Sequence, residues 1–452
     1  MLERLLDALR GARSGYTEIR YERTWMTTVA WRGRRLEAAT VATDAGGHVR
    51  CLEPGHGWGF AGFSRADELP ARVALAHELS RATRPLQPVA LAPMPVQDWA
   101  YLPDLGGDAR DVPLAEKCAL VEALNAEMLD FDRRIVDTRA AWQDAVTEFW
   151  YVNSEGTRGH GVRPNAALSA LAVAREGGTV ERAVESVGAH GGWVRAQGRE
   201  ELFRAAARRA VSLLGAQPVR SGAYPVILDP RLAGVVAHEA VGHLCEADAS
   251  RDPGRTVAPV GTRLGSERLT IGDDGSAPGL RSSSPFDDEG TPTGNTLLVQ
   301  NGVVVSHLHT RETAAQGDGR PTGNARTTSW RHAPLARMTA TYVANGAGTL
   351  DDLLRDVRLG VYAVDAIASR RHGDDIAFTA GHGFMIRDGE IAELVKHVVV
   401  AGRVTDLLGA VDRVAGDFRW HEAGGGCSRY GQGPLPVAEG APHVRLERAE
   451  VR

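Results

Sequence analysis

The sequence contains few lysines, few cysteines and no long apolar run. Lys117 and Lys396 are the only lysines among the 52 Lys and Arg residues, a bias that we interpret as GC-rich coding rather than as function. Asp and Glu number 57, so the net charge is −5 and the chain lacks the strong basic excess typical of nucleic-acid binders. No window approaches the roughly 18 apolar residues of a membrane span. We therefore expect neither a membrane association nor a direct nucleic-acid partner.

The four cysteines are far apart and show no paired spacing: Cys51, Cys118, Cys245 and Cys427. Such a distribution argues against a disulfide framework and favours a reducing compartment. Residues 1–10 form an amphipathic pattern that carries acids, which differs from the apolar core of a signal peptide. These features predict a cytoplasmic protein.

A chain of 452 residues, 43% of them hydrophobic, is long enough for two or three domains. We expect an α+β fold in which small N-terminal α/β units precede a large, mostly antiparallel β-rich C-terminal domain with one metal-binding helix. Changes in pattern and proline content give the following boundaries: an N-terminal α/β unit at 1–84, a proline-rich linker at 85–112, a central α/β unit at 113–216, and the C-terminal domain at 222–452.

Apolar periodicity and turn residues predict the elements inside these units. Helices are expected at 2–12, 69–82, 114–129, 197–214, 231–246 and 350–355, and strands include 16–23, 25–31, 37–43 and 303–308. Turns are expected at Asp44-Ala-Gly-Gly, Asn153-Ser-Glu-Gly, Asn301-Gly302 and Asp388-Gly389.

His238, Glu239 and His243 lie in one of these predicted helices. Two histidines that flank a glutamate resemble the HExxH signature, in which the histidines bind zinc and the glutamate is the general base. The spacing here is five residues, which separates the two side chains by about 140° around a regular helix. If both bind one ion, the helix must widen or kink, most easily at Gly242. The alternative is that both histidines cap carbonyls or pack in the core.

A catalytic zinc site needs a third protein ligand, and the spacing of the residues leaves several choices open. The candidates are Cys245, Glu246, Asp248, His307, His309, His382, His421 and Cys427. His307 and His309 alternate on an expected strand, where a polar strand face is the more common explanation. Cys427 follows three glycines, which allow close backbone approach to an ion. Two acidic clusters, formed by Asp273, Asp274, Asp287, Asp288 and Glu289, lack an EF-hand spacing and are expected to be turn-forming acids.

An ordered series of motifs resembles the TldD branch of the TldD/PmbA family, which carries an HExxxH sequence. The series consists of His238-Glu-Ala-Val-Gly-His243, Gly272-Asp-Asp-Gly, Phe286-Asp-Asp-Glu-Gly290, Gly323-Asn-Ala-Arg326 and Gly424 to Pro436. The resemblance implies a metallopeptidase in which His238, His243 and Cys427 hold one Zn²⁺ per chain and Glu239 is the general base. It also implies a heterodimer with a TldE/PmbA-like subunit that lacks the motif.

The implied substrates are small or unfolded peptides, or a peptide-bearing biosynthetic intermediate. The chain departs from the family pattern at Cys427-Ser-Arg-Tyr and at Ala340, departures that concern substrate preference rather than the metal set. His382, Arg326 and Tyr430 are candidates for the oxyanion partner. Two alternatives to a peptidase are a non-proteolytic protein that regulates gyrase by binding, and a zinc amidohydrolase of specialised metabolism.

Overall fold

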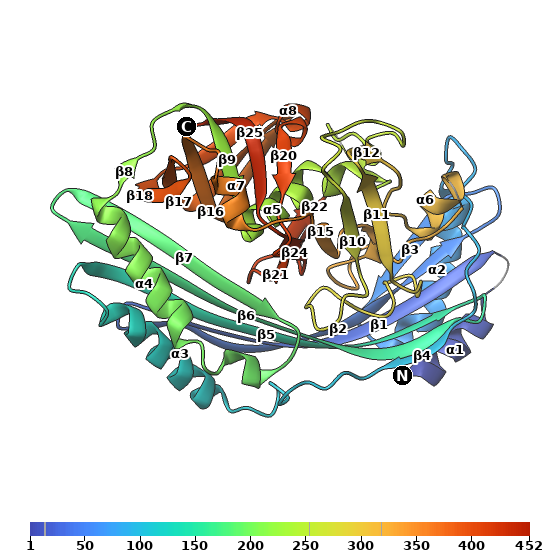
Figure 1. Cartoon of the computed structure of the whole chain (residues 1–452). Helices are drawn as coiled ribbons and strands as arrows, with labels where there is room; N and C mark the ends of the chain where they lie inside the picture. Colours follow the sequence, from blue (N-terminus) through green and yellow to red (C-terminus); the bar gives the residue numbers. More distant parts are fainter. Residues whose placement is uncertain (13–14, 253, 318) are drawn as a thin grey trace.

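One long, curved sheet forms the N-terminal half of the protein (Figure 1). The computed structural model describes residues 1–12, 15–252, 254–317 and 319–452. Seven strands make this sheet in the order β3-β2-β1-β5-β6-β4, with β7 also paired to β6. Their bounds are β1 Tyr16–Arg32, β2 Arg35–Leu52, β3 Trp58–Phe63, β4 Asp98–Tyr101, β5 Ile135–Asn153, β6 Arg158–Glu176 and β7 Thr179–Ala189.

The long strands β1 and β5 join the two N-terminal parts of the chain. They pair antiparallel from Glu18 opposite Asn153 to Arg32 opposite Arg139. Residues 1–84 and 113–216 therefore supply strands to the same sheet. The proline-rich segment contributes β4, which pairs in parallel with β6 at the sheet edge.

Side chains along β1 point alternately to the two faces of this sheet, and the two faces pack against different parts of the protein. Ile19 and Val29 point to the face that packs against helices, whereas Arg20 contacts Asp288 of the C-terminal half on the other face. Four helices cover the first face: α1 Leu2–Arg10, α2 Leu69–Ala82, α3 Leu114–Leu129 and α4 Glu200–Gly215. The C-terminal half lies in the concavity of the sheet (Figure 1).

The described residues of the C-terminal half form two larger sheets and two small hairpins. An eight-stranded sheet consists of β8 Gln217–Pro218, β9 Gly222–Leu228, β16 Leu359–His372, β17 Asp375–Arg387, β18 Glu390–Lys396, β19 Val399–Arg403, β20 Val411–Val414 and β25 Val444–Val451. A six-stranded sheet consists of β10 Ile271–Asp274, β11 Asn295–Gln300, β12 Val303–Val304, β15 Ala340–Val343, β21 Arg419–His421 and β24 Ala438–Ala441. The hairpins pair β13 Ala325–Arg326 with β14 Leu335–Ala336, and β22 Cys427–Arg429 with β23 Gln432–Leu435.

Among the described residues, four short α-helices accompany these sheets: α5 Pro230–Ala240, α6 Arg311–Gln316, α7 Leu350–Leu354 and α8 Val404–Gly409. Most strand pairs of the molecule are antiparallel, which confirms the expected α+β class with a β-rich C-terminal region. Helices α6 and α8 were not expected from the sequence. None of the described helices is both long enough and apolar enough to cross a lipid bilayer.

Several local predictions are confirmed, and two are wrong. The turns at Asn153-Ser-Glu-Gly, Asn301-Gly302 and Asp388-Gly389 each lie between successive strands. The expected turn at Asp44-Ala-Gly-Gly instead lies inside β2. Gly46 is needed there for close approach, because a Cβ atom would lie 2.4 Å from the Trp330 ring. The expected strand at 303–308 ends after Val304, so His307 and His309 do not alternate on a strand.

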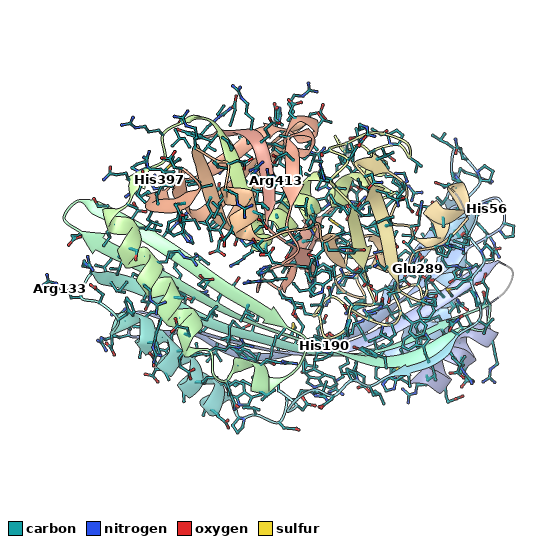
Figure 2. All side chains as sticks on the ribbon, in the orientation of Figure 1. His56, Arg133, His190, Glu289, His397 and Arg413 are labelled. Atoms are coloured by element: carbon teal, nitrogen blue, oxygen red, sulfur yellow. The ribbon has the colours of Figure 1, made fainter. Side chains whose placement is uncertain are left out.

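Buried ion pairs fasten the C-terminal half to the sheet. Asp288 accepts hydrogen bonds from Arg20 and Arg163, and Glu289 accepts one from Arg50 at 3.1 Å. Figure 2 shows Glu289 where the two halves meet and His190 near the middle of the sheet. Asp288 and Glu289 thus have arginine partners, whereas Asp287 accepts hydrogen bonds from the backbone N–H groups of Glu289 and Thr291, as a turn-forming acid does.

Candidate metal centre

Helix α5 carries the first part of the site and has a well-defined beginning. The Asp229 carboxylate accepts a hydrogen bond from the Leu232 backbone N–H at 2.8 Å, and Pro230 occupies the first helical position. Burial raises the pKa of Asp229 to about 6, which the hydrogen bond from Leu232 only partly offsets. Leu232 and Ala237 are buried in the C-terminal core, so one face of the helix is fixed by packing.

The helix changes its winding between the two histidines. Regular α-helix ends at Ala240, and Gly242–Leu244 form a 3₁₀ turn. This departure at Gly242 brings the His238 and His243 rings to 5.2 Å between centroids, despite their five-residue spacing. Glycine is required at this position because a Cβ atom would lie 1.9 Å from Met338 Sδ.

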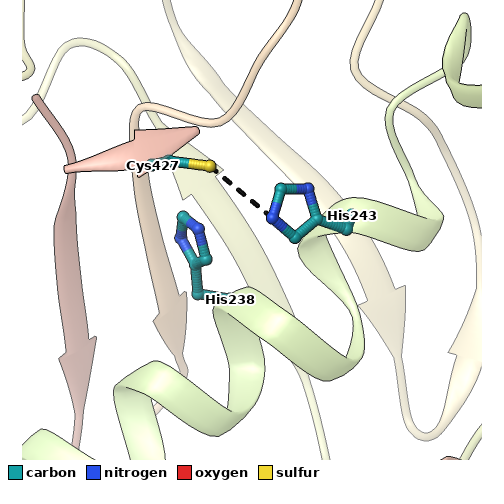
Figure 3. Close-up of side chains that lie close together, drawn as sticks. All are labelled: His238, His243 and Cys427. Atoms are coloured by element: carbon teal, nitrogen blue, oxygen red, sulfur yellow. Dashed lines mark hydrogen bonds between the residues drawn. The ribbon is translucent and has the colours of Figure 1, made fainter. Parts of the chain in front are cut away.

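Cys427 reaches the histidines from the β22–β23 hairpin, more than 180 residues later in the chain (Figure 3). The backbone before it runs close to the opposite arm, where a Cβ on Gly426 would lie 2.4 Å from the Leu435 carbonyl oxygen. Cys427 Sγ lies 3.5 Å from His243 Nε2, and one potential ligand atom from each of the three residues lies within 4.8 Å of the others. His238 and Cys427 are 3% and 8% exposed.

This donor set fits zinc. Ligand atoms about 2.0–2.3 Å from a tetrahedral zinc lie about 3.3–3.6 Å apart, which matches the distance between Cys427 Sγ and His243 Nε2. Burial opposes the thiolate, but hydrogen bonding and charge from both histidines outweigh burial and lower the pKa of Cys427 to about 5. At His238 burial lowers the pKa, but the hydrogen bond and the charge of Cys427 outweigh burial and raise the pKa to about 10. A thiolate with two imidazoles leaves a fourth position open for catalysis.

Glu239 lies beside the three potential ligands. Its side chain is 31% exposed, and its Oε2 atom lies 3.8 Å from His243 Nε2. Because it is partly exposed, this carboxylate is accessible to a water or substrate that lies beside the two histidines. The structure thus places all four residues of the predicted site together.

Glu246, one of the candidates for the third ligand, does not join the His-His-Cys group and lies behind His243 instead. It is fully buried, and its Oε2 atom lies 2.9 Å from His243 Nδ1, the ring nitrogen on the far side from Cys427. This contact orients the imidazole, as outer-shell carboxylates do at many metal sites. The charge of His243 lowers the pKa of Glu246 even though burial raises it.

Two buried arginines, Arg337 and Arg429, surround this carboxylate and were not anticipated from the sequence. Their nearest nitrogens lie 3.7 and 3.6 Å from Glu246, and Arg337 also donates to the Cys427 carbonyl at 3.0 Å. Arg429 follows Cys427 by two residues and binds Asp248 at 2.6 Å. The closeness of Arg429 to Cys427 in the sequence was the one feature that could have indicated its place near the site. The pair connects the turn after α5 to that hairpin.

The remaining ligand candidates do not join the His-His-Cys group within the described ranges: Cys245, Asp248, His307, His309, His382 and His421. Cys245 is buried in the apolar core, which raises the pKa of its thiol to about 12. His307 Nε2 lies 2.7 Å from the Ala258 carbonyl oxygen, and His309 Nδ1 lies 3.1 Å from Thr313 Oγ1. Both histidines therefore serve local structure.

A cleft of about 320 Å³ lies between the concave face of the sheet and the C-terminal half. Its lining includes Leu435, whose backbone pairs with that of Cys427 in the β22–β23 hairpin, whereas His238, Glu239, His243 and Cys427 themselves do not line it. Arg326, one of the candidate oxyanion partners, also lines the cleft. Tyr430, another candidate, is 69% exposed at the tip of the hairpin.

Comparison with known proteins assigns the chain to a family. Three models of PmbA/TldA metallopeptidase domains match it: domain 1 at residues 17–80, the central domain at 107–214 and the C-terminal domain at 221–452. The chain belongs to the TldD/PmbA family of metallopeptidases. A metalloprotease of Synechocystis sp. is 34% identical to it over 96% of this chain and 94% of its own length. A zinc metalloprotease TldD homolog of Saccharolobus solfataricus is 29% identical over 64% of this chain and 65% of its own length.

Solved structures share the TldD/PmbA fold along the whole chain. A protein described as a putative modulator of DNA gyrase from Thermotoga maritima matches with a TM-score of 0.81 and 20% identity, covering 100% of both chains. TldE from Thermococcus kodakarensis matches with a TM-score of 0.77 and 17% identity, covering 99% of this chain and 98% of its own. At these identities the likeness concerns the fold alone.

Proposed function

We propose that this family member is a zinc-dependent peptidase that hydrolyses small or unfolded peptides or a peptide-bearing biosynthetic intermediate. The observation that carries the proposal is the convergence of His238, His243 and Cys427, with Glu239 beside them, in a chain of a metallopeptidase family. His238, His243 and Cys427 would hold one Zn²⁺. When bound, zinc supplies a Lewis acid that lowers the pKa of its water towards ~7 and polarises the scissile carbonyl.

The side chains around the metal would divide the remaining work. Glu239, the partly exposed acid at the site, accepts the proton of the attacking water and returns it to the leaving amine. Glu246 holds the Nδ1 side of His243, so that Nε2 faces Cys427 and the metal position. The cleft next to Leu435 would receive the peptide.

A TldE/PmbA-like subunit is the partner that we propose. Support comes from family membership and from the whole-chain match to a solved TldE, which shows that the same fold occurs in proteins of that name. Such a subunit would complete the enclosure of the cleft. The proposed assembly is a heterodimer in which this chain contributes the metal ligands.

Peptide digestion tests the proposed function. The zinc-loaded chain, alone and with a TldE-like partner, is incubated with a peptide library, and new termini are identified by mass spectrometry. Glu239→Gln should retain zinc and lose cleavage, whereas Glu393→Gln, which alters an exposed glutamate on β18, should retain both. Full cleavage by Glu239→Gln would remove Glu239 as the base. Zinc binding without cleavage of any peptide, with or without the partner, would contradict the peptidase proposal.

A further inference from the structure

The arginines that line the cleft differ in their partners. Arg20 and Arg163 both form ion pairs with Asp288. Arg281 and Arg326 line the same cleft, but neither forms an ion pair with a carboxylate among the described residues. Carboxylates such as Glu422 and Glu439 lie near enough to Arg281 to raise its pKa, and Asp288 does the same for Arg326, but within the described residues neither guanidinium has a carboxylate in direct contact.

Backbone oxygens and one side-chain amide hold these two guanidinium groups. Arg281 donates to Asn165 Oδ1 and the Gly425 carbonyl, each at 2.9 Å, whereas Arg326 donates to the Pro436 carbonyl at 2.7 Å. Gly425 precedes Cys427 by two residues, and Pro436 directly follows β23. The two arginines therefore contact the segments that flank the two arms of the hairpin that carries the candidate zinc ligand.

Both guanidinium groups are in surroundings that disfavour their charge. Arg281 is 8% exposed, and burial lowers its pKa. Burial also lowers the pKa of Arg326, to about 10. Neutral acceptors compensate a buried cation less well than a carboxylate does, because a carboxylate supplies an opposite charge as well as a hydrogen bond. An anionic ligand in the cleft would supply the missing compensation.

Unpartnered hydroxyl groups in the same lining provide a second, independent observation. Ser282 Oγ and Ser283 Oγ are buried and have no hydrogen-bond partner among the described residues. Ser282 is 5% exposed and directly follows Arg281. Native proteins satisfy nearly all buried polar atoms, so two unsatisfied hydroxyl groups on residues that line a cleft are groups that a bound water or ligand can satisfy. Hydroxyl groups donate to carboxylate oxygens.

We propose that Arg281, Arg326 and Ser282 bind a carboxylate of the peptide substrate, next to the bond to be cleaved. The inference rests on the proposed peptidase function and extends it to a preference among substrates. The carboxylate can be the C-terminal α-carboxylate or the side chain of an acidic residue, since both present the same two acceptor oxygens. Peptides without a carboxylate near the scissile bond bind more weakly.

Binding without turnover tests this preference. The probes are fluorescein-labelled penta-alanine with a free carboxylate, its C-terminal amide, and the amide with one Glu or one Gln in place of an alanine. Their affinities for the zinc-loaded full chain carrying Glu239→Gln are measured by fluorescence anisotropy. A carboxylate probe should bind at least tenfold more tightly than the neutral probe of the same length. The tighter of the two carboxylate probes shows whether the site prefers the C-terminal carboxylate or an acidic side chain. Equal affinities, or no measurable binding of either carboxylate probe, would overturn the inference.

Variants locate the preference in the cleft. In the same background, Arg326→Gln and Ser282→Ala should each reduce the carboxylate-to-amide affinity ratio at least threefold. Arg387→Gln, an exposed arginine on β17, should leave it unchanged. The ratio is insensitive to general damage, because both probes meet the same variant. Ser282→Ala removes a hydroxyl that has no hydrogen-bond partner in the described part of the chain. An unchanged ratio in both cleft variants would overturn the assignment.

The test of the carboxylate site and the test of the proposed peptidase function can fail independently. Carboxylate selectivity without cleavage of any peptide by the wild-type chain would remove the peptidase proposal and leave the carboxylate site. Cleavage of peptides without selectivity would remove the carboxylate site and leave the peptidase.

Discussion

Glu246→Gln removes the charge of the buried carboxylate behind His243 while keeping the shape of its side chain. The carboxylate lies 2.9 Å from His243 Nδ1, and its nearest arginine nitrogens, on Arg337 and Arg429, are 3.7 and 3.6 Å away. All three of these charged partners are then left without the anion. Because Glu246 is fully buried, solvent cannot replace it.

Two effects of different size follow from this substitution. Loss of an outer-shell carboxylate typically weakens metal binding 10- to 100-fold, which corresponds to about 1.4–2.7 kcal/mol. Removing one partner of a buried ion pair typically destabilises a fold by about 3–5 kcal/mol, an upper bound here because Gln still accepts a hydrogen bond. We therefore expect a lower melting temperature without zinc and a weaker zinc affinity in the folded protein.

Competition with a zinc chelator and thermal melting of the metal-free protein measure the two effects of Glu246→Gln separately. The matched control is Glu267→Gln, which changes a glutamate that is 83% exposed. In cobalt-substituted protein the thiolate-to-cobalt charge-transfer band should persist, because Cys427 still supplies its ligand. Zinc affinity and melting temperature both equal to those of the control would refute the orienting role of Glu246.

Three further substitutions test other parts of the structure. Gly242→Ala places a Cβ 1.9 Å from a methionine sulfur, so it should destabilise the fold by about 1–3 kcal/mol and weaken zinc binding, as melting and chelator competition would show. Burial raises the pKa of Asp229 to about 6, so its contribution to the free energy of unfolding is full below pH ~4 and decreases as the pH rises through 6. Asp229→Asn should therefore become more stable relative to wild type by up to about 3 kcal/mol between pH 4 and 7 in urea titrations. Lys117→Ala leaves Asp144 buried without its cation at 2.7 Å and with only the Trp142 indole N–H as a side-chain donor among the described residues, so it should cost about 3–5 kcal/mol without changing zinc affinity.

Each of these predictions has a result that contradicts it. Gly215→Ala, whose added Cβ meets open space, is the control for Gly242→Ala, and equal stabilities would show that the contact with the sulfur is not tight. A pH-independent stability difference for Asp229→Asn would contradict the raised pKa of Asp229. A Lys117→Ala variant as stable as wild type would mean that Asp144 is not effectively buried.

Local periodicity predicted much of the fold, because most helices and hairpin turns depend on neighbouring residues. The helix at 69–82 and the Asn301-Gly302 turn required no knowledge of distant contacts. Local pattern predicts a turn at Gly46 and Gly47. The contacts that require glycine at these positions are made by residues elsewhere in the chain, which a local pattern does not show. Trp330, nearly 300 residues later in the chain, packs where a side chain at Gly46 would be, and Phe63 packs where one at Gly47 would be. The pairing of β1 with β5 is likewise a property of the tertiary fold.

Some residues of the candidate site could be predicted from local spacing, whereas others could not. The histidine spacing indicated that the helix must change its winding near Gly242, and the structure has a 3₁₀ turn there. The place of Cys427 came from family resemblance, since its contact with His243 spans 184 residues. The orienting role of Glu246 depends on which side of the His243 ring it meets. That depends on the turn geometry, which the sequence pattern does not specify.

Zinc stoichiometry in the wild-type chain and in Cys427→Ala is the most direct test of the proposed metal centre. Metal analysis of the purified wild-type protein should find close to one zinc per chain, and Cys427→Ala should lose it. Cys245→Ala, which changes a cysteine in the apolar core, should retain zinc. Full zinc in Cys427→Ala would contradict the assignment of the His-His-Cys site.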